Sequence, residues 1–244
     1  MSQISINMHY KFAETLLSYR QSDSPYYETG DRCVIIVETR QNYWLPAVVN
    51  NVIERLPGWK IYIVGSNCSI EYLRSKVTHK LNFVLLPNEN LPISQYNRLF
   101  LSTTFWAAFK EESVLIVQPD CLILREPTEK HLQHPFIGAV CYSQDENTFI
   151  MNGGLSLRKR SVMLKICSTL LQGNENQPED VVFSNIIRKH RLGMPSMEDC
   201  NSFAIESFGD ISSVVGIHGT DKGYLSSNRI DEIFEAIDTP SDSL

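Results

Sequence analysis

Short apolar blocks separated by polar turns fill the first half of the chain, and their spacing predicts alternating strands and helices. Continuous apolar runs are typical of strands covered on both faces of a sheet. Such runs occupy residues 33–37, 60–64, 81–86 and 114–124. Between the first two, apolar residues recur every three or four positions over 44–56, which predicts an amphipathic helix that ends at Pro57 and Gly58. Strands that alternate with helices indicate βαβ units around a mostly parallel sheet.

The other segments continue this pattern with less regularity. We expect helices over 8–19, 69–76, 94–109, 160–171 and 178–190, strands over 136–141 and 155–157, and a polar loop over 143–147. The sequence therefore predicts an α/β fold, a Rossmann-type three-layer α/β/α sandwich with a mostly parallel central sheet. One domain over 31–225 accounts for these elements, with an N-terminal extension over 1–30 and a C-terminal helix or tail over 226–244.

Composition narrows the classes of function. The 244 residues are 43% hydrophobic, enough for a sizeable core, and the formal net charge is −6. An acidic chain without a basic stripe is not typical of a nucleic-acid binder. The six cysteines are scattered without C-x-x-C pairs, which indicates free thiols and a reducing, cytoplasmic compartment. No segment has the pattern of a signal peptide or of a membrane span, so any membrane contact is expected to be peripheral.

Asp120 interrupts the apolar run 114–124 near its centre. A buried strand has no reason to carry a carboxylate there, and α/β proteins place ligand chemistry in the loops at the carboxyl ends of their strands. Asp120 is therefore a candidate metal or substrate contact. The alternative is a turn residue that caps its own backbone, which is the commoner role of a lone aspartate.

Three later features carry further candidate chemistry. Asn152-Gly153-Gly154 predicts a sharp turn with positive φ and close approach of the backbone to a ligand, although a tight turn alone also explains it. Glu179 and Asp180 open a helix, where carboxylates complement the helix dipole at almost any N-terminus; at the rim of a cleft one could also act as a general base. His218 lies in a segment of small residues from which it could reach a metal or phosphate, although a lone histidine is usually structural.

In this order, Asp120, Asn152-Gly153-Gly154, Glu179-Asp180 and His218 resemble the landmarks of GT-A-fold glycosyltransferases, namely the D-x-D element, the glycine loop, the x-E-D motif and the C-terminal histidine. Residues 33–218 are more closely similar to a little-characterised family of GT-A-like glycosyltransferases. The most specific part is Asn-Gly-Gly-Leu-Ser-Leu-Arg at 152–158, followed by Glu-Asp-Val at 179–181. The resemblance implies a GT-A-like fold and transfer of a sugar from a nucleoside-diphosphate sugar to a hydroxyl acceptor on a glycan or other biomolecule. UDP is the base-rate choice of nucleotide.

The resemblance also implies roles for single residues. Asp120 and His218 would hold a divalent cation, Mn²⁺ or Mg²⁺, against the donor diphosphate, with Gln118 in place of the first D-x-D carboxylate. An amide oxygen is a weaker, uncharged ligand, so the metal would depend on the nucleotide phosphates or be dispensable. Asp180 would be the base of an inverting transfer, with Glu179 beside it. The residues expected to contact the nucleotide sugar are Glu38, Thr39, Arg40, Asn97, Arg98, Gln118, Asp120, Asn152, Gly153, Gly154 and Arg158.

Two other functions stay open on the sequence. The loss of one D-x-D carboxylate suits a nucleotide-sugar- or carbohydrate-binding module whose catalytic centre has decayed. A sugar-nucleotide transferase, which builds the donor, usually carries a Gly-rich basic loop near its N-terminus, whereas the first strand here is followed by Glu38-Thr39-Arg40.

Overall fold

The computed structural model of the chain describes residues 30–145, 148–171, 173, 176–206 and 211–220. Residues 1–29, which include the helix predicted at 8–19, lie outside this description. The predicted C-terminal segment 226–244 also lies outside it.

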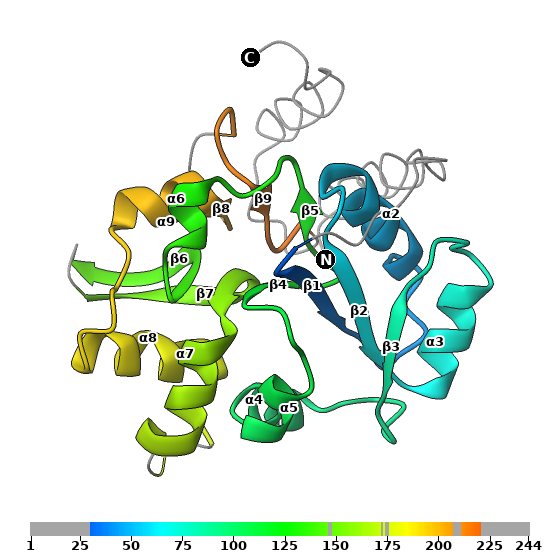
Figure 1. Cartoon of the computed structure of the whole chain (residues 1–244), viewed down its shortest axis with the longest axis horizontal. Helices are drawn as coiled ribbons and strands as arrows, with labels where there is room; N and C mark the ends of the chain where they lie inside the picture. Colours follow the sequence, from blue (N-terminus) through cyan, green and yellow to red (C-terminus); the bar gives the residue numbers. More distant parts are fainter. Residues whose placement is uncertain (1–29, 146–147, 172, 174–175, 207–210, 221–244) are drawn as a thin grey trace, which may run out of the picture.

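A six-stranded sheet runs through the molecule in the order β3-β2-β1-β4-β7-β6 (Figure 1). Its strands are β1 (Arg32–Val37), β2 (Lys60–Gly65), β3 (Asn82–Leu85), β4 (Ser113–Val117), β6 (Phe136–Asp145) and β7 (Thr148–Lys159). The pairs β1/β2, β2/β3 and β1/β4 are parallel, and β7 is antiparallel to both β4 and β6. Every residue of β1 and β4 after the first is buried, which explains why their apolar runs are continuous rather than alternating.

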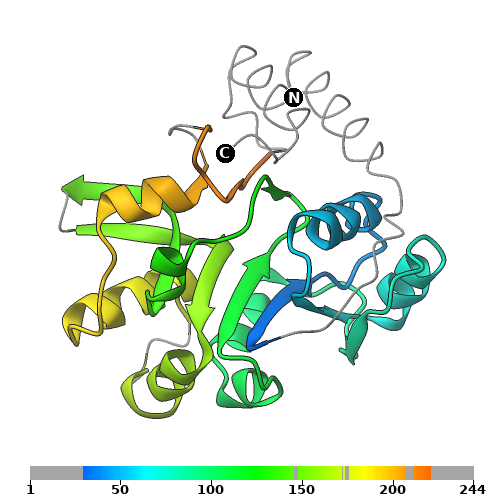
Figure 2. The same ribbon diagram turned by 45° about the horizontal axis from the view of Figure 1, so that its top comes forward.

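Helices cover both faces of this sheet (Figures 1 and 2). On one face lie α2 (Leu45–Arg55), α3 (Asn67–Arg74) and α9 (Met197–Phe203), with α6 (Glu129–Leu132) beside α9. On the other lie α4 (Ile93–Phe100), α5 (Thr103–Ala107), α7 (Arg160–Lys165) and α8 (Glu179–Lys189). The predicted α/β/α sandwich with a mostly parallel sheet is therefore confirmed. No helix in the described ranges is both long and apolar enough to cross a bilayer.

A second, smaller sheet carries the C-terminal part of the described chain. It is made of β5 (Leu122–Ile123), β9 (Gly216–Ile217) and β8 (Ala204–Ile205), in that order. The side chain of Asn51, fully buried on α2, pairs with the backbone of β5: its Nδ2 donates to the Ile123 carbonyl at 2.9 Å, and its Oδ1 accepts from the Ile123 N–H at 2.8 Å. Asn51 thus takes the place of a strand neighbour and fixes the chain that leaves β4.

The predicted helix over 94–109 is two helices instead of one. α4 ends at Phe100, and the chain is extended at Ser102 before α5 begins. This break lets both Phe100 and Trp106 be buried, and the indole Nε1 of Trp106 donates to the Phe100 carbonyl at 2.6 Å. The hydrogen bond satisfies a carbonyl that the end of α4 leaves without a helical partner.

Three further elements differ from the sequence-based expectation. The run 114–124 is divided into β4 and β5. The helix predicted over 160–171 is α7 followed by a π-helical segment, Ile166–Leu170. The predicted polar loop over 143–147 is largely absorbed into the hairpin of β6 and β7, with residues 146–147 outside the described part.

Candidate functional site

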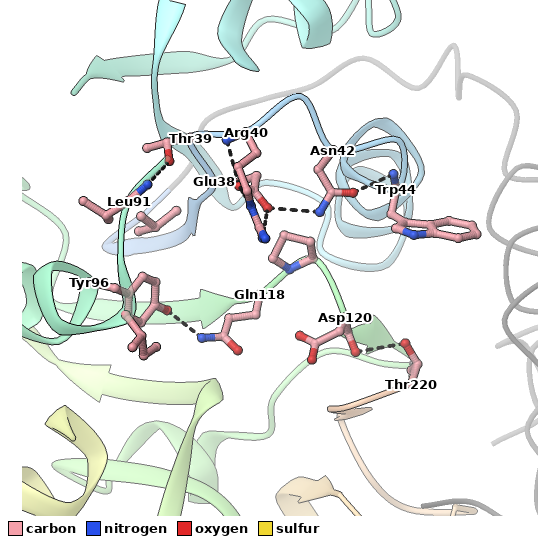
Figure 3. Close-up of a pocket in the computed structure, with 13 residues that line it drawn as sticks. Glu38, Thr39, Arg40, Asn42, Trp44, Leu91, Tyr96, Gln118, Asp120 and Thr220 are labelled. Atoms are coloured by element: carbon pink, nitrogen blue, oxygen red, sulfur yellow. Dashed lines mark hydrogen bonds and ion pairs between the residues drawn. The ribbon is translucent and has the colours of Figure 1, made fainter. Parts of the chain in front are cut away.

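A cavity of about 360 Å³ opens at the carboxyl ends of β1 and β4 (Figure 3). From β1 the sheet continues through β2 and β3 on one side and through β4, β7 and β6 on the other. The two strands therefore flank a topological switch point, where open α/β sheets bind ligands. The lining residues come mainly from the segments that follow β1 and β4, and they are Val37, Glu38, Thr39, Arg40, Asn42, Trp44, Leu91, Ile93, Tyr96, Gln118, Pro119, Asp120 and Thr220.

A fixed ion pair forms the wall after β1. Both carboxylate oxygens of Glu38 accept hydrogen bonds: Arg40 Nε and Nη2 donate at 2.9 and 2.8 Å, and Asn42 Nδ2 donates at 3.0 Å. Burial raises the pKa of the Glu38 carboxyl, but these hydrogen bonds outweigh it and hold the pKa below its ordinary value. Glu38 is only 4% exposed, whereas the Arg40 side chain is 64% exposed. The pair therefore presents a guanidinium, rather than a carboxylate, to a ligand at this rim.

Hydrogen bonds of Thr39 and Tyr96 connect other lining segments of the cavity. The Thr39 hydroxyl accepts from the Leu91 N–H at 2.8 Å, which ties the segment after β3 to the end of β1. The hydroxyl of Tyr96 on α4 accepts from Gln118 Nε2 at 2.9 Å, so the Gln118 Oε1 atom points away from α4. Burial raises the pKa of Tyr96, which keeps its phenol protonated.

The segment after β4 is a turn. The Cys121 N–H donates to the Gln118 carbonyl at 3.0 Å, with Pro119 at a position that favours such turns. The Thr220 N–H and hydroxyl both donate to the Asp120 carbonyl, at 3.1 and 3.0 Å. Asp120 therefore lies in a turn, as one of the two interpretations of the sequence predicts, and it also lines the cavity.

His218 lies beneath this turn and is 2% exposed. Its Nε2 atom lies 3.1 Å from Gln118 Oε1 and 3.6 Å from Asp120 Oδ1. Its Nδ1 atom lies 3.4 Å from Glu206 Oε1. The structure thus brings His218 next to Gln118 and Asp120, which precede it by about a hundred residues, as expected for a shared site.

Asn152-Gly153-Gly154 is not a turn. It lies inside β7, and neither glycine has a positive φ. Instead, a side chain from another part of the protein packs directly against each glycine, on opposite faces of the strand. A Cβ at Gly153 would lie 2.1 Å from Glu179 Oε1, and one at Gly154 would lie 2.2 Å from His218 Nε2. Glycine is therefore needed at both positions because Glu179 and His218 leave no room for a Cβ, not because of the backbone conformation.

The predicted roles of Arg158 and Glu179 as direct contacts are wrong, because these side chains bind each other inside the protein. Arg158 is fully buried, and its two terminal nitrogens donate to the two carboxylate oxygens of Glu179 at 2.7 and 2.8 Å. Burial raises the pKa of Glu179, and Arg158 opposes that rise. Arg158 Nη2 also donates to the Gly153 carbonyl at 3.2 Å. The pair therefore packs against β7 and bonds its backbone, and neither side chain lines the cavity.

Asp180 lies on the same side of β7 as this pair and is half-buried. Its Oδ2 atom accepts from the Gly153 N–H at 3.3 Å, and its Oδ1 atom accepts from the Val181 N–H at 2.8 Å. The Gly153 N–H is free to donate to Asp180 because the pairing of β6 and β7 shifts register here. Ser156 pairs with Gly138, and the next pair along β6 joins Val140 to Met151, which leaves Gly153 in the bulge between them. Asp180 does not line the cavity. It bonds the backbone of Gly153, and the next residue, Gly154, packs against His218 and Gln118.

Asn97 and Arg98 do not line the cavity either, contrary to prediction. Asn97 Oδ1 accepts from the Glu179 N–H at 3.4 Å, and Arg98 Nη2 donates to Asn176 Oδ1 at 2.9 Å. Both therefore attach α4 to the start of α8. Tyr96 is among the lining residues not predicted, and it lies within the segment 94–109, for which only a helix was expected.

The site has the donor set for a hard divalent cation. Gln118 Oε1, Asp120 Oδ1 and His218 Nε2 converge within the distances given above, and all three can act as ligands. The two oxygen donors suit Mn²⁺ or Mg²⁺, whereas imidazole is a ligand that transition metals prefer, so the set favours Mn²⁺ over Mg²⁺. Cys121 Sγ is also near, within 4.8 Å of donor atoms of Asp120 and His218, but it donates to the Gly154 carbonyl at 3.3 Å as a thiol. The residues present therefore fit the predicted cation.

No curated protein matches the chain. A protein-family model described as "Protein of unknown function (DUF5672)" matches residues 80–218, which is more than half of the chain. The matched stretch contains Asp120, Asn152, Asp180 and His218. The chain therefore belongs to the DUF5672 family.

Proposed function

We propose that the protein is a glycosyltransferase that moves a sugar from a nucleoside-diphosphate sugar, with UDP as the first nucleotide to test, to a hydroxyl group of a glycan or other acceptor. The observation that carries the proposal is the grouping of Gln118 and Asp120, which line a cavity at the switch point of the sheet, with His218 buried directly behind them. Such a group suits a cation and a diphosphate, and the cavity beside it has room for part of a nucleotide.

The wall after β1 would receive the nucleoside. Arg40 is exposed at the rim and held in one orientation by Glu38, and Trp44 offers an aromatic side chain on the same wall. A pre-oriented guanidinium binds ribose and phosphate oxygens at low entropic cost. Arg40 and Trp44 therefore make this wall the better candidate for the nucleoside than the buried Thr39 side chain.

Asp180 would act as the general base. The acceptor hydroxyl attacks the anomeric carbon, its proton passes to Asp180, and the bond between that carbon and the diphosphate oxygen breaks as the nucleoside diphosphate leaves. In-line attack inverts the anomeric centre. Asp180 accepts from the N–H of Gly153, and His218 packs against the next residue, Gly154, so β7 links the proposed base to the proposed cation site.

A bound Mn²⁺ or Mg²⁺ would neutralise charge on the leaving diphosphate. The chain's own contribution is to aim Asp120, Gln118 and His218 at one point and to keep that point next to the cavity. Arg158, buried under β7, contributes by holding the Gly153 carbonyl, and with it the strand that carries both ends of the reaction.

A catalytically decayed binding module is the second candidate. It is favoured by Gln118, an uncharged ligand where a carboxylate is expected, whose amide group also bonds Tyr96. Such a module would bind a nucleoside diphosphate or a nucleotide sugar without turning it over.

Calorimetry with UDP, with and without Mn²⁺, followed by a test for hydrolysis of UDP-sugars, separates the two candidates. The transferase binds UDP more tightly with Mn²⁺ and slowly releases UDP from at least one UDP-sugar in water. Binding without any hydrolysis or transfer favours the module, and no binding of nucleotide rejects both. All six cysteines are free thiols, so we place this activity in a reducing compartment, the cytoplasm.

A further inference from the structure

Both ring nitrogens of His218 lie near side-chain oxygens, and among the described residues Nδ1 is buried without a formed hydrogen bond. On one side Nδ1 lies 3.4 Å from Glu206 Oε1. On the other, Nε2 lies 3.1 Å from Gln118 Oε1 and 3.6 Å from Asp120 Oδ1. A neutral imidazole carries one proton, so it can donate to only one of these sides. The other side then brings lone pairs together, which is unfavourable unless a positive charge lies among them.

The orientation of Gln118 decides which atoms meet on the Nε2 side. In the structure its amide NH₂ group donates to the Tyr96 hydroxyl at 2.9 Å, and its carbonyl oxygen lies 3.1 Å from His218 Nε2. A cation bound there would therefore meet two oxygens, from Gln118 and Asp120, and the imidazole Nε2 lone pair. This arrangement requires the His218 proton to be on Nδ1.

Glu206 stands where it can hold that proton. It follows β8 directly, and its side chain is 14% exposed. Asn152 Nδ2 donates to both of its carboxylate oxygens, at 3.4 and 3.5 Å. Asn152 Oδ1 in turn accepts from the Gly154 N–H at 2.6 Å, so the position of Glu206 is tied to β7.

We propose that Glu206 is a positioning residue of the cation site: it accepts the Nδ1 proton of His218, fixes the tautomer that turns the Nε2 lone pair toward Asp120 and Gln118, and supplies the negative charge that Gln118 lacks. This inference rests on the cation-dependent form of the proposed function. Carboxylates that bind the second nitrogen of a metal-bound histidine raise its basicity and orient its ring.

The proposal explains how the site tolerates an amide at position 118. A divalent cation bound by Asp120, Gln118 and a neutral imidazole meets only one formal negative charge from these three ligands. With Glu206 behind the imidazole, the group carries two, as a pair of directly bound carboxylates would. Glu206, which follows β8, thus supplies through the His218 ring the negative charge that a carboxylate at position 118 would supply directly.

Titration of Mn²⁺ into the full-length protein, with UDP present and no sugar, tests the proposal. Glu206→Gln keeps the size of the side chain and removes its charge, and we expect it to weaken Mn²⁺ binding about 10- to 100-fold, the usual effect of removing such a partner. Glu198→Gln is the matched control, since Glu198 is an exposed carboxylate on neighbouring α9 and undergoes the same change of charge. It should leave Mn²⁺ affinity unchanged.

Gln118→Glu provides the positive arm. It should strengthen Mn²⁺ binding by itself and restore most of the affinity lost in Glu206→Gln, because it returns the charge directly to the cation. The midpoint of urea unfolding, measured for each variant, shows that the changes are not losses of folding. A wild-type protein that binds no Mn²⁺ with UDP overturns the proposal. A Glu206→Gln variant with wild-type affinity also overturns it. Neither result depends on sugar transfer, so the proposed activity is judged separately by hydrolysis of UDP-sugars.

Discussion

Gly154→Ala is the substitution that most sharply probes the packing of the site. A methyl group at this position would lie 2.2 Å from His218 Nε2 and 2.6 Å from Gln118 Oε1. Real Cβ contacts essentially never fall below 3.0 Å, so the imidazole or the strand must move by roughly 1 Å. His218 has little freedom to move, because it is buried and its own N–H bonds the Ile205 carbonyl at 2.8 Å.

Two effects of different size follow. Overpacking of this kind costs about 1–3 kcal/mol of folding free energy. A displacement of about 1 Å in a group that orients a reaction can cost about 100-fold in function. We therefore expect Gly154→Ala to remain folded with a modest loss of stability, to lose about tenfold or more in Mn²⁺-dependent affinity for UDP, and to lose still more in turnover.

Urea unfolding and calorimetric titration of UDP with and without Mn²⁺ measure the two effects. Gly153→Ala is the comparison, because its methyl group would meet Glu179 Oε1 at 2.1 Å on the opposite face of β7. That variant should be destabilised but keep the gain in UDP affinity that Mn²⁺ gives. A Gly154→Ala protein that binds UDP and Mn²⁺ as the wild type does would show that His218 and Gln118 do not form the ligand site.

Two further predictions concern stability. Asn51→Ala leaves the N–H and carbonyl of Ile123 buried without their side-chain partner, and we expect a loss of about 2–4 kcal/mol in the free energy of unfolding by urea. Burial would raise the pKa of Asp199, but bonds from Lys130 and Ser196 lower it from 3.8 to about 2. A lowered folded-state pKa means that the unfolded chain binds more protons between these values, so this stabilisation is present above pH 3.8 and is lost as the pH falls toward 2. Asp199→Asn should therefore be less stable at pH 6 and show a flatter loss of unfolding free energy below pH 4; an unchanged acid profile would contradict the assignment.

The fold was predictable where burial on both faces leaves a simple pattern. β1 and β4 are continuous apolar runs because nearly all of their residues are buried. The bounds of β1 agree with prediction to within one residue, whereas β4 starts within one residue of its prediction but ends at Val117 instead of 124. The 94–109 helix was mispredicted because its spacing is helical throughout. Only the burial of Phe100 and Trp106 against distant rings, such as Phe183 on α8, favours the break.

The site was predictable in part, through residues that stand at strand ends. Gln118 and Asp120 follow β4 and do line the cavity, as do Glu38, Thr39 and Arg40 after β1. The remaining errors come from long-range contacts that leave no local signal.

The paired glycines predict a turn on the sequence alone. They are instead needed because side chains from α8 and from the segment after β9 pack on the two faces of β7, and such distant contacts cannot be seen in the local sequence. Arg158 was expected to contact the nucleotide sugar, but a glutamate 21 residues later and four aromatic rings enclose it. Glu206 had no sequence signal, since it meets His218 only through the pairing of β8 with β9.

Release of UDP from UDP-sugars by the wild type and by Asp180→Asn, with Mn²⁺ and a hydroxyl acceptor present, tests the proposed transfer most directly. The substitution removes a proton acceptor but keeps the size of the side chain. The wild type should release UDP, and Asp180→Asn should be slower by about 100-fold or more while binding UDP with the same affinity, as expected for loss of a general base. An Asp180→Asn protein that turns over at the wild-type rate would remove Asp180 from the reaction, and a wild type that releases no UDP from any UDP-sugar tested would contradict UDP-dependent glycosyl transfer.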